Sequence, residues 1–297
     1  MRIVSLVPHA TELLFALGLG DQVVGVTHEC DHPAAARECR RVTRDRLPAG
    51  LRSAAVDAAV RDLTERGEAI YDLDEDALHE LQPDLIVTQA LCPVCAVSYE
   101  DVRAAADRLE PVPKVVALDP RTYGETLADV RTIAGATGAK AAGVDLVART
   151  ARRIDRVRLA VKDVPRRPRV AALEWLDPVF AAGHWTPQLV EMAGGVDVLG
   201  FAGEDSQQTT WEAVKAAAPD VIVAMPCGYD AERAREEAEL HADRLRDVGA
   251  GQVVAVDAAA TFSRPGPRLV EGLETLAHVL HPDRVPDAPG PALVVEI

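Results

Sequence analysis

The sequence predicts a mixed α/β protein made of two similar lobes that are joined by one long helix. Short apolar runs alternate with helical patterns, which is typical of parallel-rich sheets covered by helices. The pair Pro-Asp precedes an apolar run twice, at Pro83 and again at Pro219, so the two halves repeat one arrangement. We expect an N-terminal lobe at residues 1–121, a helical link at 122–167 and a C-terminal lobe at 168–297, with a cleft between the lobes.

The first half alternates strands with helices along the chain. Its strand-type runs, rich in Val, Ile and Leu, occupy residues 2–7, 22–27, 85–88 and 114–118. Its helical patterns occupy residues 10–17, ending at Gly18, and residues 76–81, and a further helix is expected to begin after the capping residue Ser98. A longer mixed segment, 33–74, carries one amphipathic pattern at residues 56–63.

The link between the lobes begins with a strong helix start signal. Thr122 and Glu125 have the spacing of a capping box, in which each side chain satisfies a backbone N–H of the other. Apolar residues then recur every three or four positions from Val144 to Val161, with Arg and Asp on the opposite side. About 23 residues at 1.5 Å each would make a rod of roughly 35 Å. It is expected to end before Pro165, because proline cannot continue a helix.

The second half repeats the pattern of the first. Its strand-type runs occupy residues 169–174, 221–224 and 252–257. Its helical patterns occupy residues 187–193 and 265–280, and Thr209 with Glu212 has the spacing of another capping box.

The composition excludes several classes of function. The 297 residues carry a net charge of −15, which disfavours nucleic acid or an anionic membrane as a partner. No apolar run approaches the roughly 18 residues of a membrane-spanning helix. Met1 leads directly into a strand-type run instead of an export signal, and five cysteines suit a reducing compartment. We therefore expect a cytoplasmic protein, or a periplasmic or extracellular one if a signal has been removed.

Residues that directly follow the strands are expected to bind a ligand, because loops at the carboxyl ends of parallel strands line such a cleft. These loops carry four of the five cysteines and two of the three tryptophans, a concentration that chance would not produce. The ligand-binding candidates are His9, His28, Glu29, Cys30, Gln89, Cys92, Trp175, His184, Trp185, Cys227, Tyr229 and Phe262.

Five of the loop residues are also candidate metal ligands, because thiolates and imidazoles are ligands that Zn, Fe or a cobalt centre would take. They are Cys30, Cys92, Cys95, His184 and Cys227. The CxxC pair Cys92 and Cys95 is a weak signal by itself, and packing at the start of a helix explains it as well. A structural zinc site would need a second closely spaced pair, which the sequence lacks.

Histidine and aromatic side chains point to a flat, metal-containing ligand. His28 and His184 could supply an axial nitrogen to the metal of a macrocycle, as histidine does for haem; a polar cleft histidine bonded to the backbone is the alternative. Trp175, Trp185 and Phe262 could stack on such a ring, or could belong to the core of the lobe.

No motif of a known enzyme class stands out. The sequence lacks a GxSxG elbow, a P-loop, an HExxH pair and a GxGxxG turn after the first strand. Glu29 and Asp31 could do acid–base chemistry, yet no nucleophile pairs with them. We therefore expect a non-catalytic binding protein.

Three stretches carry a resemblance to a known family. Residues 2–18, the block at 83–87 and the long helix resemble the class III substrate-binding proteins, which serve ABC importers of vitamin B12 and iron–siderophores. Residues 262–274 are similar to the closing helix of the vitamin B12-binding members. The loops at 28–31 and 91–95 resemble those of a cytosolic-looking cobalamin-binding subgroup. The segment 44–74 is longer than family members have at this point.

The resemblance implies two rigid lobes, a stiff helix between them, and a cobalamin-like corrinoid or other metal chelate as the bound ligand. An ABC permease would then be a partner, although this chain shows no export signal. Two other functions stay open. One is a thiol-dependent metal-handling or redox enzyme that uses the cleft cysteines, with a thiol-bound metal as its cofactor; the other is a cytosolic regulatory module that responds to its ligand.

Overall fold

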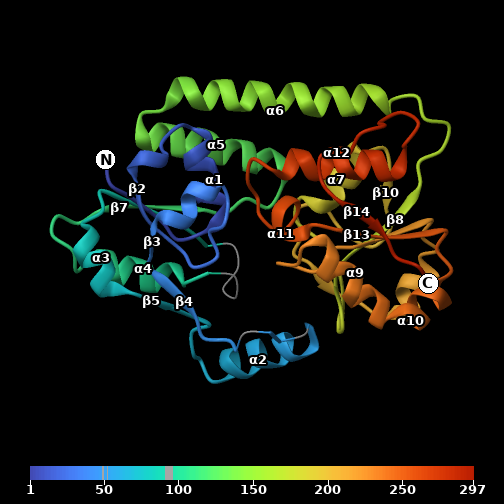
Figure 1. Cartoon of the computed structure of the whole chain (residues 1–297), viewed down its shortest axis with the longest axis horizontal. Coiled ribbons are helices and arrows are strands. Elements are labelled where there is room, and N and C mark those ends of the chain that lie inside the picture. The colour runs from blue at the N-terminus through green and yellow to red at the C-terminus, as the bar shows by residue number, and fades with distance from the viewer. Residues whose placement is uncertain (49, 52, 91–95) are drawn as a thin grey trace. The chain divides into compact units, whose positions relative to one another are not determined.

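The computed structural model describes residues 1–48, 50, 51, 53–90 and 96–297, and the chain divides into two compact units (Figure 1). Unit 1 comprises Met1–Pro120 and Leu127–Val147, and unit 2 comprises Arg121–Thr126 and Ala148–Ile297. Each unit is built around its own parallel-rich sheet, so the predicted mixed α/β class is confirmed. Within the described part of the chain, no helix combines the length and the apolar character needed to cross a membrane.

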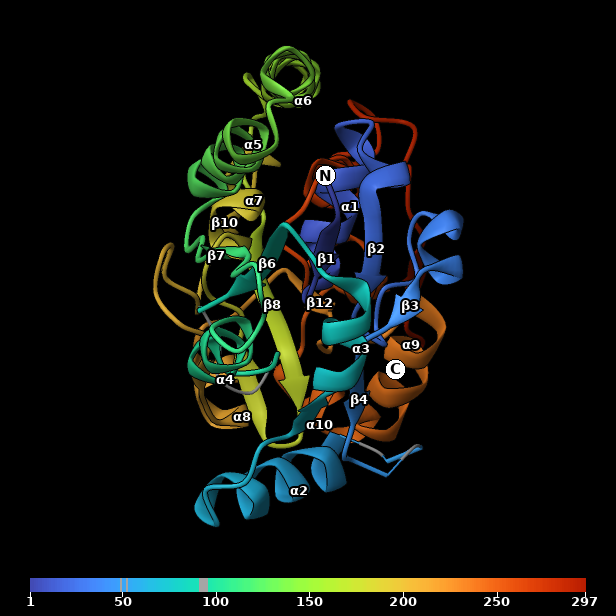
Figure 2. The ribbon, with the colours of Figure 1, turned by 90° about the vertical axis from the view of Figure 1, so that its left-hand side faces the viewer.

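Unit 1 contains a five-stranded sheet with the strand order β3-β2-β1-β6-β7. Its strands are β1 (Ile3–Ser5), β2 (Val23–Val26), β3 (Arg40–Arg41), β6 (Leu85–Gln89) and β7 (Lys114–Leu118). All neighbouring strands are parallel, and β1, β2 and β6 can be followed side by side in Figure 2. Their carboxyl ends therefore meet at one edge. A separate antiparallel pair consists of β4 (Thr43–Asp45) and β5 (Tyr71–Leu73).

Helices cover both faces of this sheet. The helices that begin in the first 110 residues are α1 (Pro8–Ala16), α2 (Ser53–Glu65), α3 (Glu75–Leu81) and α4 (Tyr99–Ala106). Alternate strand residues face opposite sides: Ile3 and Val87 pack with side chains of α1 and α5 (Tyr123–Thr137). Val4 and Ile86 pack with side chains of α3 and α4. These strands are continuous apolar runs because both of their faces are buried.

Unit 2 contains a larger sheet in which antiparallel strands flank a parallel centre. Its strands are β8 (Arg169–Leu176), β9 (Val179–Ala181), β10 (Val196–Asp197), β11 (Gln207–Gln208), β12 (Val221–Ala224), β13 (Gln252–Val256) and β14 (Ala292–Val294). The main order is β11-β9-β8-β12-β13-β14, and β10 pairs with β8. The central strands β8, β12 and β13 are parallel, whereas β9, β11 and β14 are antiparallel to their neighbours.

The helices of unit 2 also pack on both sides of their sheet. They are α7 (Thr186–Met192), α8 (Trp211–Ala216), α9 (Ala231–Leu240), α10 (Ala242–Val248), α11 (Ala258–Thr261) and α12 (Leu269–Leu280). One core cluster joins Leu173 and Ile222 of the sheet to side chains of α8, α9 and α10. Val170 and Ala172 alternate with Leu173 and are also buried, and α7 contacts both β8 and α12.

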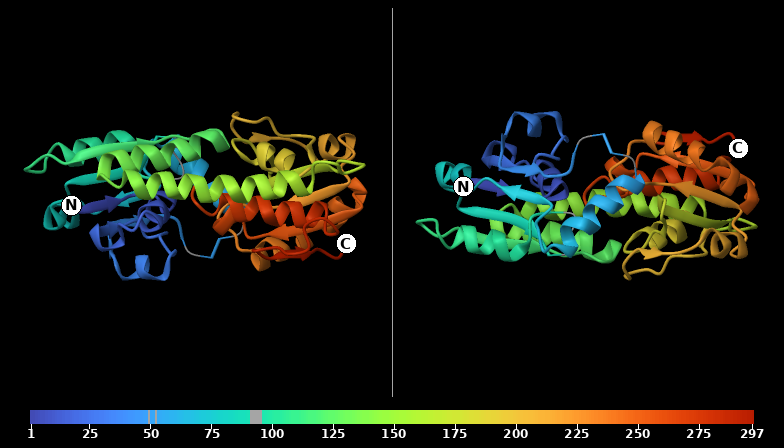
Figure 3. Two further views of the ribbon diagram at one scale, coloured as in Figure 1. Left: turned by 90° about the horizontal axis from the view of Figure 1, so that it is seen from above. Right: turned by 90° about the horizontal axis from the view of Figure 1, so that it is seen from below.

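The long helix α6 (Lys140–Ala160) contributes residues to both units. It ends before Pro165 as expected, but the predicted apolar face is wrong at Val144, which is 73% exposed. The reason is a close contact with α5, which runs beside this part of α6 (Figure 3). A Cβ on Gly143 would lie 2.6 Å from Cβ of Ala134. The contact line therefore follows Gly143 and Leu146, and Val144 faces outward.

Two of the three predicted helix caps are confirmed. The Thr122 N–H donates to Glu125 Oε2 at 2.9 Å, and the Glu125 N–H donates to Thr122 Oγ1 at 3.3 Å. Ser98 caps α4. The cap at Thr209 is wrong by one residue, because Thr210 Oγ1 accepts the Ala213 N–H at 3.2 Å. Thr209 donates its own N–H to Val179 O and so extends the pairing of β11 with β9.

Candidate functional site

A shallow hollow lies at the carboxyl ends of β1 and β2 in unit 1. The hollow is open to solvent and too shallow to enclose a water molecule. Side chains from the strand ends, the β4–β5 pair and the segment before α4 line it: Leu6, Thr27, His28, Glu29, Thr43, Tyr71, Ala96 and Val97. Two of the predicted ligand-binding residues, His28 and Glu29, therefore lie in one hollow.

The ring of His28 is held through one of its two nitrogens. Thr43 Oγ1 lies 2.8 Å from His28 Nδ1 and accepts the His28 backbone N–H at 3.0 Å. The same hydroxyl donates its hydrogen to Thr27 Oγ1 at 2.9 Å. With the single hydrogen of Thr43 directed at Thr27, Nδ1 carries the ring proton and donates it to Thr43. The lone pair of the neutral ring is therefore on Nε2.

The surroundings of His28 keep this ring neutral. Burial lowers the pKa of His28 below its usual 6.5; the charge of Asp45 raises the pKa and that of Arg41 lowers it, both by less than burial does. Tyr71 packs against the ring, with 5.4 Å between the ring centroids. Nε2 makes no hydrogen bond to any described residue. A neutral imidazole with one nitrogen bonded and the other open is suited to bind a metal.

The other predicted residues of unit 1 are more deeply placed. His9 is the second residue of α1 and is 3% exposed, and Gln89 is the buried last residue of β6. Cys30 is buried, and its Sγ lies 3.0 Å from Thr11 Oγ1 of α1. Cys92 and Cys95 lie outside the described residues.

In unit 2, Trp175, Cys227, Tyr229 and Phe262 lie at or after the carboxyl ends of β8, β12 and β13, whereas His184 and Trp185 follow the antiparallel strand β9. Contrary to expectation, Trp175 does not follow the first strand but lies within β8, which continues to Leu176 because it pairs with β9 there. The loop after β12 is tied to β8, since the Cys227 N–H donates to Glu174 O at 3.2 Å. It is also tied to the loop after β13, since the Ala259 N–H donates to Tyr229 O at 3.0 Å.

The aromatic residues of this edge pack on one another. Trp175 and Tyr229 meet edge to face, with 5.7 Å between their centroids, and the Arg233 guanidinium lies 3.7 Å from the centroid of Tyr229. Trp185 is 6% exposed and donates its indole N–H to Phe262 O at 2.8 Å. The side chains of Tyr229 and Phe262 are also buried, whereas that of Cys227 is exposed.

His184 lies under a strap formed by residues 200–206. Its Nε2 lies 3.2 Å from Asp205 Oδ1, which Arg121 also contacts at 3.2 Å. The His184 N–H donates to Glu204 O at 2.6 Å, and His184 has a left-handed backbone with φ of 50°. The strap lies so close that a Cβ on Gly183 would be 2.5 Å from Glu204 O. His184 therefore fastens the strap through the nitrogen that His28 leaves open.

The strap covers Glu174, a residue that the sequence interpretation missed. Glu174 Oε2 accepts a short hydrogen bond from Ser206 Oγ, which in turn accepts the Gly183 N–H at 3.1 Å. Burial raises the pKa of Glu174, against smaller lowering effects of Ser206 and His184. The sequence offered one signal for Glu174, because it is a lone acidic residue in an apolar strand-type run. Thr43 and Tyr71 were missed too, and no pattern links them to His28.

The predicted metal ligands do not form a cluster in the part of the chain that the structure describes. No group of three or more His, Cys, Asp or Glu side chains there is arranged to hold a metal ion. Cys30 belongs to unit 1, whereas His184 and Cys227 belong to unit 2. Among the described residues, none joins His28 in such a group.

The fold with these two edges matches known proteins. Residues 3–252 match the family described as periplasmic binding protein. The chain belongs to this family. The uncharacterised ABC transporter substrate-binding lipoprotein YvrC of Bacillus subtilis is 25% identical to it over 304 residues, which is 95% of this chain and 80% of that protein. A vitamin B12-binding protein of Vibrio cholerae is 54% identical over 41 residues, only 15% of its length.

Solved structures of the periplasmic binding protein fold agree along nearly the whole chain. The vitamin B12-binding protein BtuF of Vibrio cholerae is similar with a TM-score of 0.67 and 21% identity, covering 94% of this chain and 96% of that one. A periplasmic haem-binding protein of Pseudomonas aeruginosa is similar with a TM-score of 0.70 and 18% identity, covering 100% and 98%. At these identities the likeness establishes the fold.

Proposed function

We propose that this chain is a non-catalytic substrate-binding protein of the ABC importer type and that its ligand is a metal chelate. The family match supports the binding role, and the printed names of similar proteins point to vitamin B12 and haem. A cobalamin-like corrinoid is the first ligand to test, with haem as the comparison. An importer permease would be the partner of the loaded protein.

The observation that carries the chelate proposal is the state of His28. Thr43 holds the proton of the ring on Nδ1, and the lone pair of Nε2 is left without a described partner beside a hollow. A chelate that encloses its metal in the plane has open axial positions, and a neutral imidazole nitrogen is a ligand of that kind. Purely organic ligands would gain little from this arrangement.

The aromatic edge of unit 2 supports the same class of ligand. Trp175 is half-buried at the carboxyl end of β8, while Tyr229, which packs against it, and Phe262 are buried. A rigid ring such as that of Trp175 provides contact area at a low entropic cost. Its Nε1 is buried and has no partner among the described residues, which is unusual for a buried polar group.

The test is a visible-absorption titration with aquocobalamin and, separately, with haemin. We expect one of them to bind at one per chain with a change in its spectrum, because nitrogen replaces water on the metal. His28→Ala should weaken this binding at least tenfold and remove the spectral change. The control is His79→Ala on the exposed side of α3, which should leave both unchanged. Titrations in which neither chelate binds would contradict the proposal.

A further inference from the structure

Unit 1 contains a β-hairpin whose two strands are connected through a helix. Its stem is the antiparallel pair β4 and β5, in which Thr43 pairs with Leu73 and Asp45 with Tyr71. Beyond the stem the chain forms α2, as Figure 1 and Figure 2 show. No other strand pair of unit 1 is antiparallel among the described residues. The hairpin is therefore an addition to a sheet that is complete without it.

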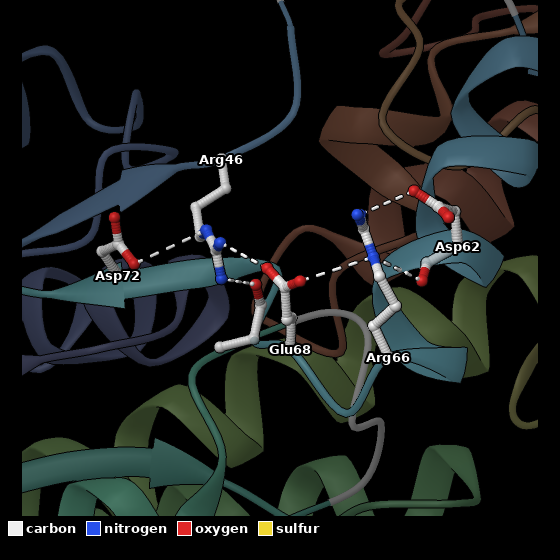
Figure 4. Close-up of polar contacts among 6 residues, drawn as sticks. Arg46, Asp62, Arg66, Glu68 and Asp72 are labelled. Carbon is white, nitrogen blue, oxygen red and sulfur yellow. Dashed lines mark hydrogen bonds and ion pairs between the residues drawn. The ribbon is translucent and has the colours of Figure 1, made fainter.

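An ion-pair network closes the neck between the stem and α2 (Figure 4). Arg46 donates to Glu68 at 2.7 Å and to Ala69 O at 2.9 Å, and it lies 3.9 Å from Asp72 of β5. Arg66 joins Glu68 at 3.4 Å to Asp62 of α2 at 2.6 Å. Single exposed pairs stabilise little, but here Glu68 contacts both Arg46 and Arg66, and Arg46 also bonds the backbone O of Ala69. The network holds the end of α2 to the stem.

The stem is continuous with the hollow around His28. Thr43, the first residue of β4, accepts the His28 N–H and fixes its ring, and Tyr71, the first residue of β5, packs on that ring. The base of the stem is also bonded to the main sheet, because the Val42 N–H donates to Val26 O at 3.0 Å. The position of α2 and the orientation of His28 therefore depend on the same two strands.

One face of α2 is apolar and incompletely covered. Val56, Ala59 and Val60 recur at helical spacing and are half-buried, while Leu63 on the same face is buried. The opposite face carries Ala58, Arg61 and Glu65, which are exposed. Three small side chains fall far short of the roughly 800 Å² per partner that a stable protein interface buries. They suit the rim of a small molecule better than a second protein chain.

We propose that α2 is an additional wall of the ligand site, and that Val56, Ala59 and Val60 contact the apolar periphery of the chelate bound at His28. This inference rests on the proposed function and assigns a specificity role to the hairpin. In this arrangement His28 binds the metal and α2 covers the rim of the ligand. The stem sets the distance between these two contacts. Chelates with a bulky or charged periphery would bind with lower affinity.

A protease experiment on the unmodified protein tests the contact directly. Trypsin cleavage after Arg61 is followed by mass spectrometry with and without saturating aquocobalamin or haemin, whichever binds, and cleavage after the exposed Arg152 of α6 is the internal reference. We expect the bound chelate to slow cleavage after Arg61 at least fivefold relative to Arg152. Unchanged cleavage after Arg61, while the absorption spectrum shows the chelate bound, would overturn the inference and leave the proposed function standing. A spectrum that never changes would overturn both.

A pair of matched variants then identifies the face. Val56→Ser with Val60→Ser should weaken chelate binding about fivefold or more, whereas Ala58→Ser with Glu65→Gln on the exposed face should change it less than twofold. Circular dichroism checks that both variants keep their helix content. Equal affinities of the two variants would overturn the inference. So would sedimentation data in which the unmodified chain without chelate is a dimer that Val56→Ser with Val60→Ser dissociates, because the face would then bind a second copy.

Discussion

The two histidines that the sequence suggests as ligands of a metal look alike there and differ in the structure: His28 follows the parallel strand β2, whereas His184 follows the antiparallel strand β9. His28 of unit 1 is bonded through Nδ1 to a neutral hydroxyl and leaves Nε2 without a described partner. His184 of unit 2 uses Nε2 to contact Asp205, which Arg121 also contacts. Threonine hydroxyl groups hold His28 beside the hollow. His184 lies under the strap of residues 200–206, which also covers the carboxyl group of Glu174.

This difference separates a binding residue from a positioning residue. A metal takes the nitrogen farther from the backbone, Nε2, most easily, and of these two histidines it is His28 that offers it. His184 instead joins the strap to the sheet, so its loss should loosen the strap rather than remove a ligand. The same residue type, placed after a strand in each unit, thus serves two purposes, which its hydrogen-bond partners decide.

The largest expected effect concerns stability and should distinguish the two edges. Trp185→Ala removes a buried ring and the hydrogen bond to Phe262 O, so we expect a loss of about 3–5 kcal/mol of unfolding free energy. Tyr71→Ala, the aromatic counterpart beside His28, removes a half-buried ring and should cost less than half as much. Urea unfolding of both variants measures the difference. Equal losses would mean that the His28 edge is packed as tightly as the other.

A second prediction uses the buried carboxyl group under the strap. Because burial raises the pKa of Glu174, the folded protein favours its neutral form. The resulting stabilisation is complete below the usual value of 4.5 and is lost as the pH rises through the raised pKa. Glu174→Gln cannot ionise, so its unfolding temperature should exceed that of the unmodified protein increasingly from pH 5 to pH 8.

The exposed residue Glu204 of the same strap provides the control for this series. Glu204→Gln should show the pH dependence of the unmodified protein, because its side chain is in water in the folded and unfolded states alike. A constant difference between Glu174→Gln and the unmodified protein across this pH range would show that Glu174 ionises equally in both states. The strap would then not depend on a neutral carboxyl group.

The third prediction concerns the hydroxyl group that orients His28. Thr43→Val keeps the shape of the side chain but removes the acceptor for Nδ1, so the ring proton is free to move to Nε2. We expect chelate binding to weaken threefold to tenfold, while Thr43→Ser should retain most of the affinity. Absorption titrations of the two variants give the comparison. Equal binding by the valine and serine variants would show that Thr43 does not select the tautomer.

Local patterns in the sequence predicted the fold well where neighbours in the chain decide the structure. The runs at 85–88 and 221–224, the capping box at Thr122 and the end of the long helix before Pro165 all follow from short-range rules. The antiparallel strands β9, β11 and β14 were not predicted, because two or three residues of strand carry no period to recognise. Val144 was placed on the wrong face because the contact of Gly143 with Ala134 is tertiary.

In the candidate site, too, local features could be predicted from the sequence and tertiary contacts could not. Strand ends were visible in the sequence, so His28 and Glu29 could be named beforehand, although they are two of the eight residues that line the hollow. Their roles could not, because they depend on partners such as Thr43, fifteen residues from His28, or Asp205 in the strap. Glu174 was overlooked although an acid in an apolar run is unusual, because its meaning appears only when Ser206 is seen to cover it.

The smallest expected effect is a shift in the titration of His28 itself. Since burial lowers the pKa of this ring and Asp45 partly opposes that effect, Asp45→Asn should lower the pKa further. The variant keeps the oxygen that accepts the Leu47 N–H, so the stem should be unchanged. A lowered pKa means that the stabilisation from the neutral ring is complete above pH 6.5 and is lost as the pH falls through the folded value. Proton NMR of the ring hydrogens measures both values, and a pKa at or above 6.5 in the unmodified protein would show that the ring is charged too readily to serve as an open metal ligand.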